Sequence, residues 1–347
     1  MRSERSLPAR LAVSFCALCG LCALVAAPKA SAQAPAASST SNSARPASAA
    51  AGAASSSQFK VVCGHDCLAE FAERFLYGLT HHDASAVALA PNVRYTENGA
   101  QLAIGDALWA TAQGLGDNKL VFTDPASGGI QLYAAVVESG LPSMLAARLK
   151  VEHRQITEIE TSVLRRNADD AAMTSFAVDR PIWRQQVAAK SRVSRQALLD
   201  IADSYFDGIT QGRGDITPFD PMCTRFENGG QMTLRPDPAP NPVTKMSCHE
   251  QFAAGMLVIV TSVSHRRYLV VDEDNQIVCA IATFDHRGNL SARPDARGRD
   301  YKPNGAFTRP FSFLIFEAFK VVDGKIRQIE ATVFSVPYRM SPGWPDQ

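Results

Sequence analysis

One stretch of this chain occurs twice. The segment RYTENGAQL, from Arg94 to Leu102, returns as TRFENGGQM from Thr224 to Met232, so that the core Glu-Asn-Gly-x-Gln recurs 130 positions further on. Residues 68–99 lie over residues 198–229 without a gap, and their apolar positions agree. The residues of the first copy that recur identically are Leu68, Ala72, Gly78, Thr80, Pro91, Glu97, Asn98 and Gly99.

The ends of the two copies also match. LKVEHRQITEIETSVL (149–164) lies over FKVVDGKIRQIEATVF (319–334) at an offset of 170, so the second copy carries about 40 extra residues (170 − 130). We place these extra residues in inserts near 233–247 and 287–310. A period of this length is too long for a solenoid, and it predicts a tandem duplication of one domain.

Each copy is predicted to begin with an amphipathic helix, because apolar residues in helical spacing run over 68–79 and 198–209. Ser194 is a candidate N-cap for the second of these helices. Further helices are expected near 104–114 and 248–257, after each Glu-Asn-Gly joint. Alternating apolar runs predict strands near 130–138, 143–152, 155–164, 265–273, 276–285, 311–322 and 325–334, with a hairpin turn at Asp323-Gly324.

The first 57 residues differ in composition from the rest. A positive start, an apolar stretch from Leu11 to Ala27 and small residues before Gln33 predict a signal peptide over 1–32, with an anchoring helix as the alternative. Residues 33–57 are almost wholly Ala, Ser, Pro and Gln, which predicts a flexible linker. The first domain then spans 58–187 and the second 194–347, and the protein is predicted to be secreted or periplasmic.

Cysteines outside the signal fit an exported chain, in which disulfides form readily. Cys223 and Cys248 flank a Pro-rich insert, and Cys63 and Cys67 flank a helix start, so a disulfide is predicted for each pair. The segment CGHDC also suggests a zinc site, but its spacing fits no usual zinc pattern and a second ligand pair is missing, so we predict no metal. Cys279 is expected to be a buried free thiol.

The net charge of +1 at pH 7 argues against a nucleic-acid-binding protein, which would need a basic face. No other apolar run is long enough to cross a bilayer, so no membrane contact is expected after signal removal.

The helix ending in YFDGIT, the ENG joint and the terminal FKVVDGKI…IEA hairpin resemble the nuclear transport factor 2-like (SnoaL-like) family, in tandem over nearly the whole mature chain. Among its members the sequence is most similar to secreted two-copy proteins of largely unassigned function. The resemblance implies an α+β fold with two cone-shaped domains, each a curved antiparallel sheet wrapped over helices. It also implies an internal pseudo-dimer, with the chain a monomeric pseudo-dimer or a homodimer, and a pocket for a small apolar molecule in the cone.

Enzymes of this family use acid–base groups in the cone and usually no cofactor, whereas other members only bind ligands or partners. Ketosteroid-isomerase-like members place a tyrosine on the first helix, a carboxylate base at the joint and an acidic donor on a late strand. Tyr205, Glu227 and Glu317 of the second copy match these places, whereas the first copy has Phe75 and Ala147 in place of Tyr205 and Glu317.

Plain structural roles remain open for these residues. Tyr205 alternatively packs in the core, and Glu227 alternatively caps backbone amides at a turn that Asn228 and the following glycine make. Glu317 alternatively pairs with an arginine of the second insert. On the catalytic interpretation, an apolar face around Glu317 would raise the pKa of its carboxyl group toward that of a proton donor.

Other residues are candidates of second rank. Asp285 and His286 end a strand and are possible acid–base groups, with a surface strand end as the alternative. The candidate substrate-binding residues are Asn228, Phe313, Phe319 and Arg267. Arg267 alternatively belongs to a solvated edge face.

The sequence thus predicts an exported, cofactor-free acid/base enzyme (an isomerase, dehydratase or lyase) that acts on a small apolar oxygenated molecule. The alternative is a non-catalytic module that binds a small ligand or a partner.

Overall fold

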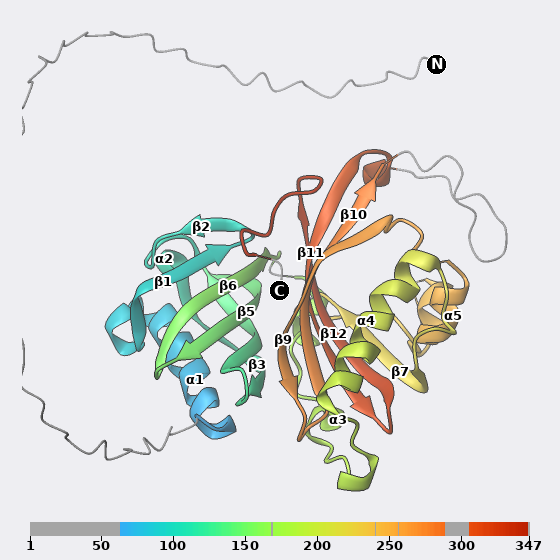
Figure 1. Cartoon of the computed structure of the whole chain (residues 1–347). Helices are drawn as coiled ribbons and strands as arrows, with labels where there is room; N and C mark the ends of the chain where they lie inside the picture. The colour runs from blue at the N-terminus through green and yellow to red at the C-terminus, as the bar shows by residue number, and fades with distance from the viewer. Residues whose placement is uncertain (1–62, 168, 240, 256, 289–304, 346–347) are drawn as a thin grey trace, which may run out of the picture. The chain divides into compact units, whose positions relative to one another are not determined.

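The computed structural model describes residues 63–345, apart from 168, 240, 256 and 289–304 (Figure 1). The predicted signal peptide (1–32) and linker (33–57) lie outside the described residues, as does most of the insert near 287–310. Within the described ranges, no helix is both long and apolar enough to cross a membrane.

The first half of the described chain begins with helix α1 (His65–His81) and then forms a six-stranded sheet (Figure 1). The strand order across it is β2-β1-β6-β5-β4-β3. The strands are β1 (Leu89–Glu97), β2 (Ala100–Leu102), β3 (Ala112–Asp124), β4 (Gly129–Glu138), β5 (Leu141–Glu152) and β6 (Gln155–Arg165). The short helices of this half are η1 (Ala84–Ala86) and α2 (Leu108–Thr111).

The second half repeats the arrangement after helix α4 (Arg195–Gln211), with the strand order β8-β7-β12-β11-β10-β9. The strands are β7 (Phe219–Glu227), β8 (Gly230–Gln231), β9 (Ser262–Asp272), β10 (Ile277–Arg287), β11 (Pro310–Val322) and β12 (Lys325–Val336). The short helices are η4 (Pro242–Lys245), α5 (Cys248–Ala253) and η5 (Gly305–Thr308), and the segment between the halves holds η2 (Ala171–Thr174), α3 (Pro181–Arg184) and η3 (Ala189–Ser191). Two sheets of the same strand order make this an α+β fold, as predicted.

The sheets are mixed. Strands β4 to β6 and β9 to β12 form the predicted antiparallel meanders, and β3, which was not predicted, extends the first of them. In contrast, β1 pairs with β6, and β7 with β12, in parallel. The antiparallel expectation therefore holds for the meanders and not for these two pairs.

At each Glu-Asn-Gly joint, the asparagine side chain bonds to the backbone of the parallel partner strand just beyond the paired residues. The amide of Asn98 accepts from the Val163 backbone N–H at 2.8 Å and donates to the Val163 carbonyl at 3.2 Å. Asn228 makes the same two bonds to Val333, at 2.8 and 3.1 Å. Both asparagines have positive φ, 51° and 46°, and begin the tight turn between the flanking strands. The prediction that Asn-Gly makes a turn is confirmed.

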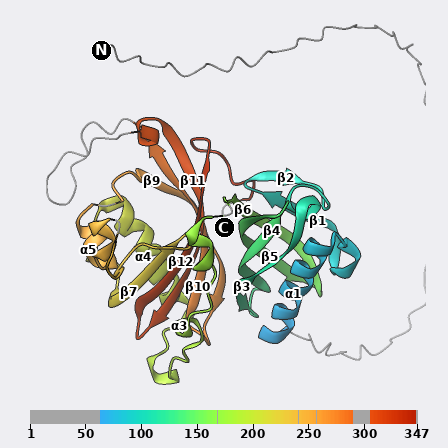
Figure 2. The ribbon, with the colours of Figure 1, turned by 180° about the vertical axis from the view of Figure 1, so that it is seen from behind.

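Helices α1 and α4 each cover one face of the sheet of their own half (Figure 2). Their apolar stripes are buried as the helical spacing predicts. The Ser194 hydroxyl accepts from the Ala197 backbone N–H at 3.3 Å, which confirms the predicted N-cap of α4.

The helices after the joints are shorter than predicted. Helix α2 has four residues, and the chain continues from Ala112 as strand β3, an edge strand that pairs with β4. Gly114 and Gly116 disfavour a helix there, and tertiary pairing with β4 decides the structure. Helix α5 ends at Ala253, before Gly255 with φ of 69°.

The turn predicted at Asp323-Gly324 is confirmed. Strands β11 and β12 pair directly on either side of it, at Val322 and Lys325. Both turn residues have positive φ, 49° and 72°, as a two-residue type I′ hairpin requires.

Strand β11 shows that the second sheet is apolar on both faces. Ile315, Phe319 and Val321 belong to the core under α4, whereas Leu314 and Phe316 belong to another core cluster. That cluster includes residues of both sheets, such as Tyr133 of β4 and Cys279 of β10. The outer faces of the two sheets are thus buried against each other, as expected for an internal pseudo-dimer.

A buried ion pair crosses this shared layer. The Arg267 guanidinium donates to both carboxylate oxygens of Glu160, at 2.6 and 2.9 Å, and all of these groups are buried. Glu330, which matches Glu160 at the offset of 170, instead pairs with Arg180 at 2.9 Å. Both carboxylates of the layer are therefore matched by a guanidinium.

The two predicted disulfides are present. They join Cys63 to Cys67 and Cys223 to Cys248, with Cα–Cα distances of 5.3 and 5.9 Å. Cys279 is a buried free thiol, as predicted.

Each Glu-Asn-Gly joint is covered by the segment that follows the other half. Residues 337–345, which we call the C-terminal tail, lie on the first joint, where the Trp344 indole donates to the Thr96 hydroxyl at 2.9 Å and stacks under Arg94. Residues 169–194, which we call the connecting segment, lie on the second joint, where Ser175 donates to the Gly229 carbonyl.

The covering segments give a second reason, besides positive φ, why each joint needs a glycine. A Cβ on Gly99 would lie 2.5 Å from Cε of Met340 in the C-terminal tail, and a Cβ on Gly229 would lie 2.1 Å from the backbone oxygen of Ala172 in the connecting segment. The first contact is with a flexible side chain, whereas the second is with fixed backbone.

We therefore expect Gly229→Ala to destabilise the protein more than Gly99→Ala. Both variants carry a left-handed residue, at a cost of about 1–2 kcal/mol, and Gly229→Ala adds overpacking of about 1–3 kcal/mol. Gly140→Ala is the matched control, because Gly140 has φ of 75° with nothing within 4 Å. Urea unfolding of the three variants measures the difference, and equal losses for Gly229→Ala and Gly140→Ala would contradict the packing of the connecting segment.

Candidate functional site

Three of the predicted site residues face the core of the second half. Tyr205 extends from α4, Glu227 ends β7, and Glu317 lies in the middle of β11. Tyr205 and Glu317 are buried, and the Tyr205 hydroxyl donates a hydrogen bond to the Glu317 carboxyl group. The alternation along β11 that predicted an inward Glu317 is borne out, since Ile315 and Phe319 on either side belong to the same core.

Arg225 connects these groups. It lies on β7 two residues before Glu227 and is buried. Its Nε is 3.3 Å from Oε1 of Glu227, an ion pair that lacks hydrogen-bond alignment, and its Nη1 is 3.5 Å from the Tyr205 hydroxyl. Among the described residues, the arginine that acts on Glu317 is thus Arg225, and the arginines between 289 and 304 of the insert lie outside the described residues.

Gln251 of α5 holds the far side of this guanidinium. Its Oε1 accepts from Nη2 of Arg225 at 2.7 Å, and its Nε2 donates to the carbonyls of Met232 and, at 3.0 Å, Val243. The Cys223–Cys248 disulfide joins the strand of Arg225 to the helix of Gln251. We call Tyr205, Arg225, Glu227, Gln251 and Glu317 the cone cluster.

Burial decides the charge state of Glu317. Loss of solvent raises the pKa of this carboxyl group to about 8, although the Tyr205 hydrogen bond and the Arg225 charge oppose the rise. Burial lowers the pKa of Arg225, but attraction to Glu227 and Tyr205 outweighs it, so the net shift is upward. At neutral pH the cluster therefore holds a protonated Glu317 and a cationic Arg225.

Burial also raises the pKa of Glu330, to about 7, against the effect of Arg180. Glu330 lies in the layer between the sheets, and its two carboxylate oxygens accept from the Ala177 N–H and from Arg180. In contrast, Oε2 of Glu317 has no hydrogen-bond partner among the described residues. An acid that is protonated, buried and partly unpaired is suited to donate to a ligand, which distinguishes Glu317 from Glu330.

Access to the cone cluster lies at Glu227, whose side chain is 27% exposed. Tyr205 is enclosed by the rings of Phe206, Phe219, Phe252 and Phe319, with centroid distances of 5.0 to 6.2 Å. Glu227 is thus the member of the cluster that a molecule from solvent would meet first.

Glu97, the corresponding carboxylate of the first half, has partners within the protein at both of its oxygens. Glu97 accepts from the Tyr95 hydroxyl at 3.2 Å and from the Leu108 N–H at 3.0 Å, and it pairs with Arg165 at 3.1 Å. Tyr95 matches Arg225 at the offset of 130. Glu97 therefore serves the structure of its joint.

Asp285 and His286 lie apart from the cone cluster, and neither is at the surface. The Asp285 carboxylate accepts from the hydroxyls of Ser262, Ser264 and Ser312. Both ring nitrogens of His286 lie near carbonyl oxygens, Nδ1 2.7 Å from Ile259 and Nε2 2.6 Å from Phe307. A carbonyl only accepts, so in each of these contacts the ring nitrogen is the donor.

The candidate substrate-binding residues are dispersed. Phe319 packs on Tyr205 at a centroid distance of 5.0 Å, whereas both polar ends of the Asn228 amide are bonded to Val333. Arg267 faces Glu160 in the layer between the sheets. Phe313 lines a separate cavity of about 710 Å³ near the start of β11.

Arg225 and Gln251 were missed in the sequence. A signal for Arg225 exists, because it shares the face of Glu227 in strand alternation and replaces a tyrosine of the first copy. Gln251 lies in the variable part after the joint, where the two copies cannot be aligned without a gap. No group of three or more potential metal ligands occurs among the described residues.

Comparison with known proteins gives a family of unassigned activity. Residues 191–333, less than half of the chain, match a family described as Domain of unknown function (DUF8021). A search of curated proteins finds no match.

Several solved structures share local similarity with the chain. An NTF2-like protein of unknown function from Cytophaga hutchinsonii is 11% identical, with 28% of this chain and 89% of that chain covered and a TM-score of 0.24. A candidate polyketide cyclase from Silicibacter sp. is 15% identical, with 40% and 89% covered and a TM-score of 0.25. A de novo designed protein with a curved β-sheet is 17% identical, with 41% and 88% covered and a TM-score of 0.26. Likenesses this weak transfer no activity to the chain.

The raised pKa of Glu317 predicts how pH changes stability. The unfolded chain releases this proton near the ordinary value of 4.5 and the folded chain near 8, so the contribution is present below pH 4.5 and lost as the pH rises to about 8. Glu317→Gln removes this titration. From pH 4.5 to 8, the free energy of unfolding of the variant should therefore gain on the order of a few kcal/mol relative to wild type.

Urea unfolding at several pH values measures this difference. Glu273→Gln is the control, because that side chain is 51% exposed. Parallel pH profiles for wild type and Glu317→Gln would contradict the raised pKa, because they would show the same pKa for Glu317 in the folded and unfolded protein.

Proposed function

We propose that the chain is an exported tandem NTF2-like protein whose second copy is a cofactor-independent acid/base enzyme. The observation that carries the activity is the unpaired Oε2 of Glu317, a carboxyl group with pKa of about 8 that lies beside Tyr205 in an apolar core. In the proposal, the Tyr205 hydroxyl turns from Glu317 to the substrate and donates to the same substrate oxygen as the Glu317 carboxyl group. Two such donors suit an oxygen that becomes negative during a reaction.

In this proposal Glu227 is the base. It is the exposed member of the cone cluster, and its Oε1 lies 3.3 Å from Nε of Arg225. Glu227 would take a proton from carbon next to a carbonyl group, while Tyr205 and Glu317 stabilise the enolate oxygen. Proton return to another carbon gives isomerisation, and loss of a leaving group gives dehydration or lyase cleavage.

The charges of the cluster favour an uncharged substrate. With Glu317 protonated, Arg225 and Glu227 leave the cluster without net charge. A substrate carboxylate would add an unmatched negative charge to a buried site, which is costly. The phenylalanine rings around Tyr205 further suit a small apolar ketone or a related oxygenated molecule.

The two disulfides support export, because such bonds persist in oxidising compartments. The matching strand orders support the duplication and the domain limits 58–187 and 194–347. Under this proposal the chain works as a monomeric pseudo-dimer.

A second function is favoured by the enclosure of Tyr205. Four phenylalanine rings contact it, so the cone accommodates a ligand only when these rings move. A non-catalytic module that binds small apolar molecules would have the same lining, and it would not need Glu227.

Proton exchange distinguishes the two functions. The full-length protein is incubated in D₂O with small cyclic ketones, and ¹H NMR follows the loss of the α-proton signals. We expect Glu227→Gln to abolish the enzyme-dependent exchange and Tyr205→Phe to slow it by roughly 10²-fold, the effect of losing one donor to a developing oxyanion. Glu97→Gln, at the matching place in the first copy, is the control and should exchange at the wild-type rate. Exchange by wild type that persists in Glu227→Gln would exclude Glu227 as the base, whereas ketone binding without any exchange would favour the binding module.

A further inference from the structure

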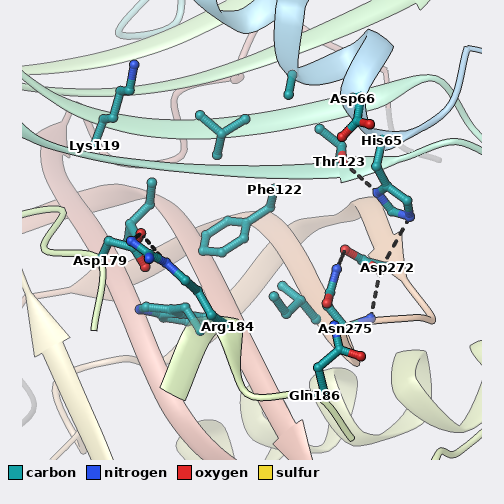
Figure 3. A pocket seen from close by; sticks show the side chains of 15 residues that line it. His65, Asp66, Lys119, Phe122, Thr123, Asp179, Arg184, Gln186, Asp272 and Asn275 are labelled. Carbon is teal, nitrogen blue, oxygen red and sulfur yellow. Dashed lines mark hydrogen bonds and ion pairs between the residues drawn. The ribbon is translucent and has the colours of Figure 1, made fainter. Parts of the chain in front are cut away.

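A cavity of about 400 Å³ lies away from the cone cluster (Figure 3). Its wall contains the start of α1, the end of β3, the connecting segment near α3 and the turn after β9. The lining residues that the argument uses are His65, Asp66, Phe122, Trp183, Arg184 and Asp272. No role in the proposed function falls to them.

The repeat supplies a matching place, at which an arginine occupies the position of His65. His65 and Arg195 are the first residues of α1 and α4, and Asp272 and Asp124 are the last residues of β9 and β3. The Arg195 guanidinium donates to both oxygens of Asp124, at 2.6 and 3.3 Å, and to the Val271 carbonyl at 3.0 Å. An arginine at the start of α4, in the second half, thus closes the contact with the end of β3, in the first half.

His65 does not replace this guanidinium. Its Nδ1 lies 2.7 Å from the Thr123 hydroxyl, and its Nε2 remains 3.9 Å from Oδ1 of Asp272 (Figure 3). An imidazole is shorter than an arginine side chain and has no fork of donors. The position beside Asp124 that the Arg195 guanidinium fills is therefore open beside Asp272.

Asp272 is prepared for a cation in the same way as Asp124. Its carboxylate is 4% exposed and accepts from the backbone N–H and the side chain of Asn275, at 2.9 and 2.8 Å. Asp124 accepts similar bonds from its own turn, at Ala126 and Ser127, and still binds the Arg195 fork. The turn bonds at Asp272 thus leave room for a bidentate donor.

The cations named below donate to groups other than Asp272, although the charge of Asp272 opposes the burial that lowers the pKa of Lys320. Lys119 pairs with Glu73 at 2.5 Å, and Arg184 pairs with Asp179. The buried Lys320 donates to the carbonyls of Gln185 and Asn275, at 2.8 and 2.6 Å. Asp66 adds a further carboxylate in the first turn of α1.

Aromatic rings form another part of the wall. Phe122 and Trp183 lie 4.9 Å apart between ring centroids, and both are buried. The indole Nε1 of Trp183 has no hydrogen-bond partner among the described residues. A carboxylate beside aromatic rings is a favourable environment for a planar organic cation.

We propose that this cavity binds a small molecule with a guanidinium or amidinium group. The cation takes the place at Asp272 that the Arg195 guanidinium takes at Asp124, and its remaining part lies against Phe122 and Trp183. The cavity, the aromatic wall and the matching Arg195–Asp124 pair carry the proposal together. The proposal does not depend on the activity of the cone cluster.

Isothermal titration of the full-length protein tests the proposal, with benzamidine and agmatine as probes and uncharged benzamide as the control ligand. Wild type should bind one equivalent of the cationic probes in a saturable way and should not bind benzamide. Asp272→Asn should weaken binding by at least about tenfold, as expected for the loss of a charge-assisted bidentate contact.

His65→Arg separates binding from folding. The new side chain reproduces the Arg195–Asp124 pair and fills the cavity, so this variant should lose probe binding while its Tm rises. Asp124→Asn breaks the matching Arg195–Asp124 pair, which lies outside the cavity, so it should lower Tm and leave probe binding unchanged. Absence of saturable binding to wild type, or undiminished binding to folded His65→Arg, would overturn the proposal.

Discussion

The structure depends on the burial of both faces of each sheet. On β11, alternate residues pack under α4 or in the layer shared by the two sheets. A single half with its outer face in water would expose a continuous apolar surface, which a soluble protein rarely tolerates. The second copy provides the cover within the same chain, and this allows charged groups such as Glu160 and Arg267 to be buried as a matched pair.

The polar and charged residues that distinguish one half from the other occur together, as partners of one another. Where the first half has Phe75, Tyr95 and Ala147, the second has Tyr205, Arg225 and Glu317, so a cation, a hydroxyl and a carboxyl group enter one core together. The start of the first helix shows the reverse, because Arg195 has a full partner and His65 has a partial one. A duplicated fold keeps its shared layer intact and can vary the remaining places in each copy separately.

The sequence was sufficient for the elements with a strong period. The stripes of α1 and α4, the long meander strands, the Asp323-Gly324 hairpin and both disulfides were predicted correctly. Strand β3 was missed, because Gly114, Gly116 and the polar residues after them lack strand alternation and the pairing with β4 imposes the extended form. Glu317 could be placed on an inner face by alternation, whereas Gln251 is brought to Arg225 by the tertiary fold. The role of the cone cluster in catalysis stays a prediction, since chemistry is not determined by fold alone.

The exchange of the C-terminal tail and the connecting segment sets an order of assembly. The first joint is closed by Met340 and Trp344, which follow the last strand of the second sheet and are therefore made after the strands of both sheets. The first half therefore cannot complete its packing until the second half has been made, even though all of its own strands are available early. The second joint has no such delay, because the connecting segment precedes it in the chain. A chain that stops before residue 337 lacks the cover of its first joint, so the first half is closed only after the second half has been made.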